Sequence, residues 1–100
     1  QAILDRRALG IGVVAFVSIS LENHTEKTCQ AFEASVLAMP EVLACHNTTG
    51  QHDYLLHIVA RDFDAYSEFV RSRLRTLPGV KELLSTLSMH EVKSSTRLHL

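Results

Sequence analysis

The sequence Met39-Pro40-Glu41-Val42 recurs further along the chain as Leu77-Pro78-Gly79-Val80. Counting back from each proline gives the same ladder of apolar residues, so the chain contains two copies of one pattern. Each copy predicts a strand, a helix that stops at the proline, and a second strand. Two copies indicate a pseudo-two-fold domain and not a solenoid. The equivalent pairs are Val17 and Leu55, Leu21 and Val59, Phe32 and Val70, and Val36 and Leu74.

The first copy is expected to form a strand over residues 12–21, which are rich in β-branched and apolar side chains. A helix should begin just after it, because Asn23 and Glu26 have the spacing of a capping box and Thr25 is an alternative cap. Pro40 ends this helix. Its expected buried stripe has helical spacing and consists of Cys29, Phe32, Val36 and Met39.

The second copy predicts strands over residues 42–49 and 53–60, joined by a turn at 50–52. Asp62 should cap a second helix, which ends at Pro78. A long strand is expected over 80–93, and 96–100 could pair as a short final strand. The expected buried stripe of the second helix is Phe63, Tyr66, Val70, Leu74 and Leu77. This order, βαββαβ, predicts an α+β fold of the ferredoxin-like kind, with one antiparallel sheet and both helices on one face.

The predicted sheet has an apolar second face that two helices on one side cannot cover. Alternate residues of the first strand can face the helices, which leaves Val14 and Phe16 on the opposite face. Both faces of the third strand are apolar too, whereas a half-covered antiparallel sheet should have a polar one. A patch of this kind is uncommon on a monomer, so we expect a sheet-to-sheet dimer of the dimeric α+β barrel type. The expected interface residues are Val14, Phe16, Leu56 and Ile58.

The length of 100 residues fits one compact domain, and 46% apolar with 21% charged residues is typical of a soluble globular fold. A net charge of -1 argues against a nucleic-acid surface on this segment. The two cysteines, Cys29 and Cys45, lie in apolar stretches and are expected to be reduced and buried. No stretch has the pattern of a secretory signal or of a transmembrane helix, so a cytoplasmic location is expected.

The run Thr49-Gly50-Gln51-His52-Asp53-Tyr54-Leu55-Leu56 resembles the Thr/Ser-Gly-x-x-Asp-Tyr-x-Leu segment of Lrp/AsnC transcription regulators. Further stretches match that family in order, namely 2–5 with 9–10, 62–66, 77–80 and 91–93. The resemblance implies a RAM domain, the module for regulation of amino acid metabolism. In that family it is ferredoxin-like, forms dimers through its sheets and then tetramers, octamers or larger rings, and binds a small amino acid between dimers.

The same resemblance implies a domain organisation. Residues 1–10 would be the connection between domains and residues 11–100 the effector-binding and oligomerisation domain. The family's DNA-binding helix-turn-helix would precede them and is absent from this sequence. A truncated chain or a stand-alone RAM protein would both fit, and the connection together with Gln1 in place of an initiating Met favours truncation.

The turn at residues 49–54 has two interpretations. It can be a tight hairpin in which Gly50 supplies an unusual φ and Asp53 accepts from N–H groups of its own turn. It can also be a ligand site, because Gly50 would expose backbone N–H groups to a carboxylate and Asp53 could accept from an ammonium. The resemblance favours the second interpretation, with ligand choice at Gln51 and His52. The candidate ligand-binding residues are Thr49, Gly50, Gln51, His52, Asp53, Tyr54 and Ser85.

No pattern of residues indicates catalysis, a metal site or a cofactor. The sequence lacks a nucleophile beside a base, a Gly-rich phosphate loop and a pair of His or Cys at helical ligand spacing. We therefore expect no enzyme and no cofactor. The alternative is a small enzyme of the dimeric α+β barrel type, a cofactor-free monooxygenase or isomerase. Its cavity would be lined by Ser18, Ser20, Thr86, Ser88 and His90.

Overall fold

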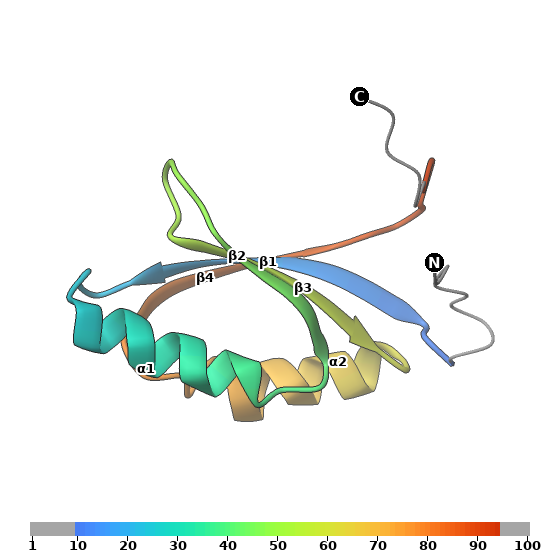
Figure 1. Cartoon of the computed structure of the whole chain (residues 1–100). Coiled ribbons are helices and arrows are strands. Elements are labelled where there is room, and N and C mark those ends of the chain that lie inside the picture. The colour runs from blue at the N-terminus through green and yellow to red at the C-terminus, as the bar shows by residue number, and fades with distance from the viewer. Residues whose placement is uncertain (1–9, 95–100) are drawn as a thin grey trace.

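The computed structural model describes residues 10–94 and contains one four-stranded antiparallel sheet with its helices on one face (Figure 1). The element order confirms the predicted ferredoxin-like βαββαβ fold. The elements are β1 (Val13–Leu21), α1 (Glu26–Leu37), β2 (Val42–Asn47), β3 (Tyr54–Ala60), α2 (Phe63–Phe69), a π-helical continuation of α2 called η1 (Val70–Leu74), and β4 (Val80–Leu87).

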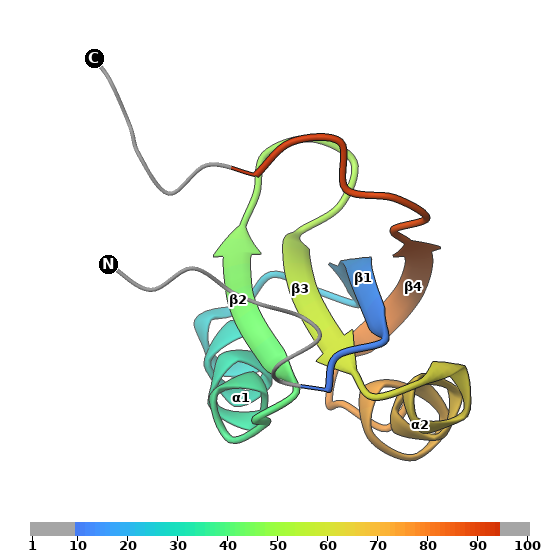
Figure 2. The same ribbon diagram turned by 90° about the vertical axis from the view of Figure 1, so that its right-hand side faces the viewer.

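The strand order β2-β3-β1-β4 reflects the internal repeat. The equivalent strands β1 and β3 pair with each other at the centre of the sheet, and the strand that follows each of them in its copy lies outside (Figure 2). Each central strand is followed by a helix that lies against the same face. The two copies are thus related by an approximate two-fold axis between β1 and β3.

Helix α1 is capped by Thr25, one of the two predicted caps. The Thr25 side chain accepts from the backbone N–H of Thr28 at 3.2 Å. Asn23 supports this cap from outside, because its Oδ1 accepts from the backbone N–H and the hydroxyl of Thr25. The helix ends at Leu37, shortly before Pro40, as the proline predicted.

The core lies between the helices and the sheet. Phe32 and Val36 of α1 are buried as predicted, as is Met39, whereas Cys29 is half-buried and Cys45 is exposed. The ring of Phe32 lies 4.6 Å from that of Tyr54, centroid to centroid. Within residues 10–94, no helix is long and apolar enough to span a membrane.

The second helix differs from the prediction at three positions, one of which is Val70, expected to be buried but only half-buried. Phe63 was expected in the buried stripe but is 59% exposed, whereas Phe69 is buried. Phe69 replaces Val70 in the buried stripe where the π-helical segment begins, in which the Arg75 N–H bonds to the carbonyl of Val70 five residues back. The wider turn shifts the side chains, so the buried stripe passes from Phe69 to Leu74. Phe63 lies in the first turn, where it lines an open hollow along the edge strand β4.

Two strands are shorter than expected. Strand β2 ends at Asn47 and not at 49, and β4 ends at Leu87 and not at 93. Pairing between β1 and β4 ends near the start of β1, where the N–H of Ser88 bonds to the carbonyl of Val14. Since β1 begins at Val13, it has no further residues with which a longer β4 could pair. The expected final strand at 96–100 and residues 1–9 of the expected connection lie outside the described residues.

The two faces of β3 correct part of the expected dimer interface. Leu56 pairs with Val17 and Ile58 pairs with Ala15, so both lie on the helix-covered face, where they have no exposed area. They therefore cannot contact a second sheet. The open face contains the other residues of β3, together with Val14 and Phe16 of β1 as expected. On β3 these open-face residues are Leu55, His57 and Val59.

Candidate functional site

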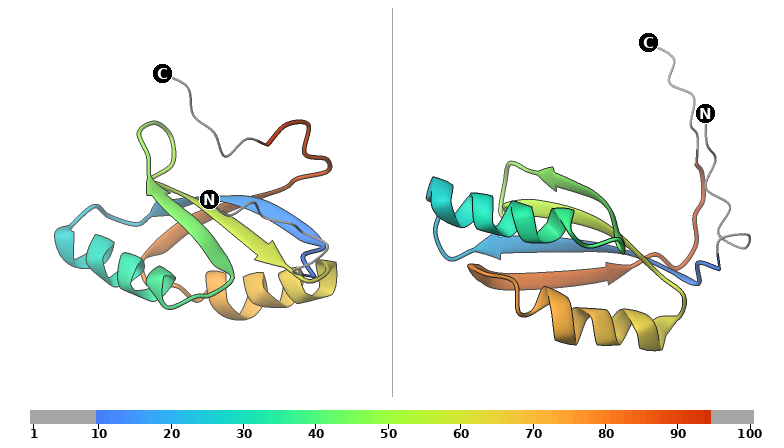
Figure 3. Two further views of the ribbon diagram at one scale, coloured as in Figure 1. Left: turned by 45° about the vertical axis from the view of Figure 1, so that its right-hand side comes forward. Right: turned by 60° about the horizontal axis from the view of Figure 1, so that its bottom comes forward.

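The turn between β2 and β3 rises on the side of the sheet away from the helices (Figures 1 and 3). Its two ends are held together, because the carbonyl of Asp53 accepts from the N–H of Thr48 at 2.9 Å and from the amide of Asn47 at 3.0 Å. The Thr48 hydroxyl also donates to the carbonyl of His52. Gly50 has φ +106°, a conformation that L side chains rarely adopt, so the unusual φ expected at this glycine is present.

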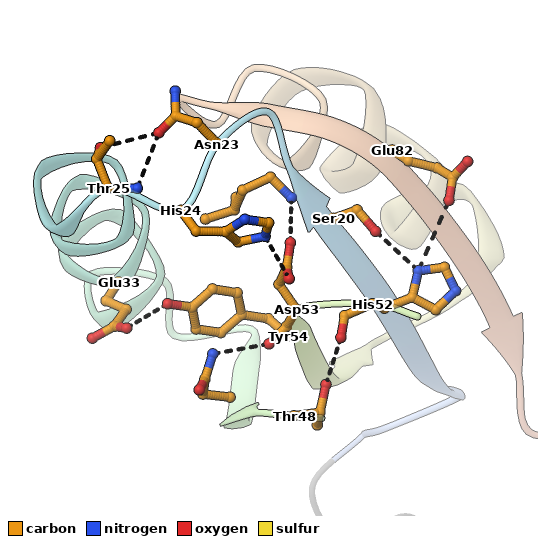
Figure 4. A network of polar contacts seen from close by, with 12 residues as sticks. Ser20, Asn23, His24, Thr25, Glu33, Thr48, His52, Asp53, Tyr54 and Glu82 are labelled. Carbon is orange, nitrogen blue, oxygen red and sulfur yellow. Dashed lines mark hydrogen bonds and ion pairs between the residues drawn. The ribbon is translucent and has the colours of Figure 1, made fainter. Parts of the chain in front are cut away.

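Asp53 links the start of β3 to the end of β1 (Figure 4). Its Oδ2 accepts from the backbone N–H of Leu21 at 2.8 Å, and its own N–H donates to the carbonyl of Ile19 at 2.8 Å. Its Oδ1 lies 2.9 Å from Nε2 of His24. In the hairpin interpretation Asp53 accepts from N–H groups of its own turn, and this is wrong. Its partners are Leu21, at the end of β1, and His24, just beyond it.

These contacts favour the charged form of Asp53. The hydrogen bond from Leu21 N–H is the largest cause that lowers the pKa of Asp53 below its usual value, and burial opposes it. The hydrogen bond and charge of His24 lower it further, as does the charge of His52. Asp53 is thus a fixed negative charge at this end of the sheet near neutral pH.

His52 lies across the end of β1 from His24. Its Nδ1 is 3.1 Å from the hydroxyl of Ser20 and 3.8 Å from Oε1 of Glu82, on β4 (Figure 4). Ser20 and Glu82 are paired residues of neighbouring strands. The ring therefore bridges β1 and β4 and is not free in solvent, as a mere turn residue would be.

A polar hollow of about 310 Å³ lies beside this turn. Three of the predicted residues, Gly50, Gln51 and Asp53, line it together with side chains from the end of β1 and the start of β4. A Cβ on Gly50 would meet nothing within 4 Å, so the approach to the turn backbone is open. Ser20, considered above only for an enzyme cavity, also lines the hollow. The lining residues that the sequence did not indicate are Leu21, His24, Lys81 and Glu82.

The hollow offers charges of both signs and unused backbone donors. Lys81 is a cation, whereas Asp53 and Glu82 are anions. Among residues 10–94, no acceptor is bonded to the backbone N–H of Gly50 or Gln51. Exposed backbone N–H groups at a positive-φ glycine can hold a carboxylate, and a side-chain carboxylate can hold an ammonium. A small zwitterion fits this set of groups.

The remaining candidate residues lie elsewhere in this chain. Thr49 is exposed and does not line the hollow. Tyr54 is buried in the core, where its hydroxyl donates to Glu33, and burial raises its pKa. Ser85 lies on the helix-covered face of β4, where its hydroxyl bonds to that of Tyr66. The turn and the fourth strand therefore meet at Lys81 and Glu82 within one chain, and not at Ser85.

The polar residues considered for an enzyme cavity lie at alternate positions because alternate residues of a strand share one face of the sheet. Ser18 and Thr86 lie on the open face, beside Leu84 and Phe16. Ser20 lines the hollow and bonds to His52. In the part of the chain that the structure describes, no group of three or more His, Cys, Asp or Glu side chains could hold a metal ion.

Residues 14–98 match the family model described as the Lrp/AsnC ligand binding domain. The chain is 33% identical over 97 residues to the DNA-binding transcriptional activator DecR of Escherichia coli strain K12, covering 97% of this chain and 64% of DecR. It is 34% identical over 97 residues to the leucine-responsive regulatory protein of Salmonella typhimurium, covering 97% of this chain and 59% of that protein. The chain thus spans less than two thirds of the curated relatives it matches.

Solved structures agree with this match. A transcriptional regulator from Neisseria meningitidis, solved as a complex with L-Met, superposes with a TM-score of 0.90 at 34% identity, covering 99% of this chain and 64% of that one. An AsnC family transcriptional regulator from Agrobacterium tumefaciens superposes with a TM-score of 0.87 at 29% identity, covering 99% of this chain and 64% of that one. This chain belongs to the Lrp/AsnC family of transcriptional regulators, and residues 14–98 match the ligand-binding domain of that family.

Proposed function

We propose that this domain binds a small α-amino acid as the effector of a transcription regulator, and that the amino acid occupies the hollow beside the 48–53 turn. The observation that carries the proposal is the set of groups in that hollow. Backbone N–H groups at Gly50 and Gln51 and the Lys81 ammonium suit the α-carboxylate. The carboxylates of Asp53 and Glu82 suit the α-ammonium.

The comparisons support the same ligand class. The similar regulator from Neisseria meningitidis was solved with L-Met, a small zwitterion. The relative from Salmonella typhimurium is named for its response to leucine. The open hollow can hold a ligand of this size, and a neighbouring copy would close it. In our proposal Gln51 and His52 choose the ligand side chain, and the exposed Thr49 of the turn meets the fourth strand of a neighbouring copy.

The proposal includes assembly. The open sheet face has an apolar centre, with Phe16 40% exposed and stacked on His57 at 4.9 Å between ring centroids. We propose that this face packs on a second copy to form a dimer, and that dimers assemble further around the effector. DNA would be bound by a separate helix-turn-helix domain N-terminal to the RAM domain, with residues 1–10 as the connection. Such a regulator would act in the cytoplasm, without a cofactor or catalysis.

Isothermal titration calorimetry of the chain against the twenty amino acids tests the proposed site. Lys81→Gln should weaken binding of the tightest amino acid roughly ten- to a hundredfold, because a charge-assisted hydrogen bond contributes about 1.5–3 kcal/mol. Lys27→Gln is the matched control, since Lys27 is exposed on α1 and outside the hollow. Saturable binding that Lys81→Gln leaves unchanged would place the site elsewhere. No binding by the wild type, with turnover of a hydroxyaromatic compound, would support the enzyme alternative.

A further inference from the structure

His24 occupies the position that an effector ammonium would need. Asp53 has two carboxylate oxygens, and the backbone N–H of Leu21 donates a hydrogen bond to Oδ2 at 2.8 Å. The other oxygen, Oδ1, is 2.9 Å from Nε2 of His24. His24 and Asp53 both line the hollow. A ligand that enters the hollow with its ammonium toward Asp53 therefore meets the imidazole first.

The two contacts to Asp53 differ in how easily they can be released. The Leu21 N–H belongs to the backbone at the end of β1, where the residue is buried, so it stays in place. The side chain of His24 is 69% exposed and lies in the connection before the Thr25 cap, so it can rotate into solvent. An exposed ion pair contributes little to stability. Displacing His24 is therefore a small cost that a bound zwitterion can offset.

We propose that His24 competes with the α-ammonium of the effector for Oδ1 of Asp53, so that it sets both the pH dependence of binding and the requirement for an ammonium. This inference rests on the proposed amino-acid site and assigns His24 the role of a specificity-determining residue. An imidazolium and an ammonium are both cationic N–H donors and exclude each other from one oxygen. A neutral imidazole keeps only an ordinary hydrogen bond, so it competes less.

The direction of the pH effect follows from the charged groups that face the pair. Asp53, Glu82 and Lys81 line the hollow, and His52 lies on its far side, beside Ser20 and Glu82. Between pH 6 and 8 carboxylates, lysine and the α-ammonium of an amino acid keep their charges, whereas histidines lose theirs. An imidazolium is the stronger competitor for Oδ1, so a higher pH favours the ligand ammonium, and Asp53 stays charged because its pKa is lowered. Effector affinity should rise with pH over this interval.

The chain offers a matched pair of variants for the test. His24→Gln removes the competing charge, and His46→Gln removes an exposed imidazole outside the hollow but leaves His24 in place. The probe is L-methionine, or the amino acid that binds most tightly in the panel of twenty, titrated calorimetrically at pH 6 and pH 8. Wild type and His46→Gln should bind about fivefold more tightly at pH 8, as displacement of an exposed ion pair allows. His24→Gln should bind equally at both pH values, with the affinity of the wild type at pH 8.

Two further readouts separate competition from a structural role. Binding at pH 6 should release protons from wild type, measured in buffers of different ionisation enthalpy, and should release fewer from His24→Gln. The 2-oxo acid of methionine, which lacks the ammonium, should not displace His24 and should bind more weakly than methionine. If no amino acid binds wild type, the proposed function fails. If wild type binds but its pH dependence persists in His24→Gln, or His24→Gln binds weakly at pH 8, the function stands and this inference is wrong.

Discussion

The carboxylate of Asp53 accepts from the backbone of a different strand, because its Oδ2 holds the N–H of Leu21 at the buried end of β1. The same residue donates its own N–H to Ile19. The Thr-Gly-x-x-Asp pattern indicates a residue of this kind near a turn, but the partner strand is set by tertiary pairing. Replacing Asp53 therefore affects folding as well as any ligand, which makes Lys81 the cleaner probe of binding.

Asp53→Asn should lower the free energy of unfolding by about 1–3 kcal/mol near pH 7, since it weakens the acceptor of a buried backbone N–H. The lowered pKa of Asp53 means that its charge stabilises the fold above the usual value of 3.8 and that this contribution is lost as the pH falls through the lowered value. The difference in free energy of unfolding between wild type and Asp53→Asn should therefore be smaller at about pH 2 than at pH 7. Urea unfolding at both pH values measures it. A gap of constant size would show that the carboxylate charge has no part in stability.

Helix α2 shows what the residue pattern can and cannot predict about an element. Asp62 caps the helix as predicted, since its Oδ1 accepts from the N–H of Ala65 at 2.8 Å. Regular helical spacing correctly places Tyr66, Leu74 and Leu77 in the core. The wider turn of η1 cannot be read from that spacing, because a π-type bond forms only where tertiary packing favours it. The sequence therefore placed Val70 in the core, whereas the structure buries Phe69.

The variants Phe63→Ala and Phe69→Ala test which of the two phenylalanines of α2 is buried. Phe69 is 6% exposed, so its replacement should cost about 3–5 kcal/mol of unfolding free energy through lost burial and a cavity. Phe63 is 59% exposed, and its replacement should change stability by no more than about 0.5 kcal/mol. Chemical unfolding of both variants gives the comparison. A larger loss for Phe63→Ala than for Phe69→Ala would mean that the helix packs with the spacing that the sequence predicted.

The sequence likewise predicts some features of the strands and not others. The repeat predicts the order of the elements, and the structure adds that the equivalent strands β1 and β3 are central while β2 and β4 are at the edges. The repeat is wrong about the covered face of β3, because it equates Val17 with Leu55, whereas Val17 is buried and Leu55 lies on the open face. Both sets of alternate residues of β3 are apolar, and a shift of one position exchanges them. Leu56 and Ile58 were assigned to the wrong face for this reason. The length of β4 likewise depends on where β1 ends, which its own residues do not encode.

At the scale of the whole molecule, the sheet has one covered face and one open face (Figure 1). Phe16 lies at the centre of the open face, and its nearest paired neighbours are His57 and Thr86. The sequence predicted this unpaired apolar face correctly from β1. It could not predict the hollow, because His24 and Lys81 come from distant positions that only the sheet register brings to the turn.

Phe16→Asp should convert the dimer that we propose into a monomer, because it places a charge at the centre of an apolar interface. Burial of one such aromatic side chain contributes about 1.5–3 kcal/mol. Light scattering at low micromolar concentration should give twice the 11.2 kDa chain mass for wild type and the single mass for the variant. Phe63→Asp, on the helix side, should leave the dimer intact. A wild-type mass of one chain would contradict the proposed dimer.

The central claim is that an amino acid binds beside the 48–53 turn, and backbone amide NMR during a titration tests it most directly. With the tightest-binding amino acid, we predict that the largest saturable shifts occur at Gly50, Gln51, His24 and Lys81, the residues of the hollow. The same titration of Lys81→Gln should give the same pattern at a higher ligand concentration. Saturable shifts centred instead on the separate hollow between α1 and β2, which Val36 and Cys45 line, would contradict the claim.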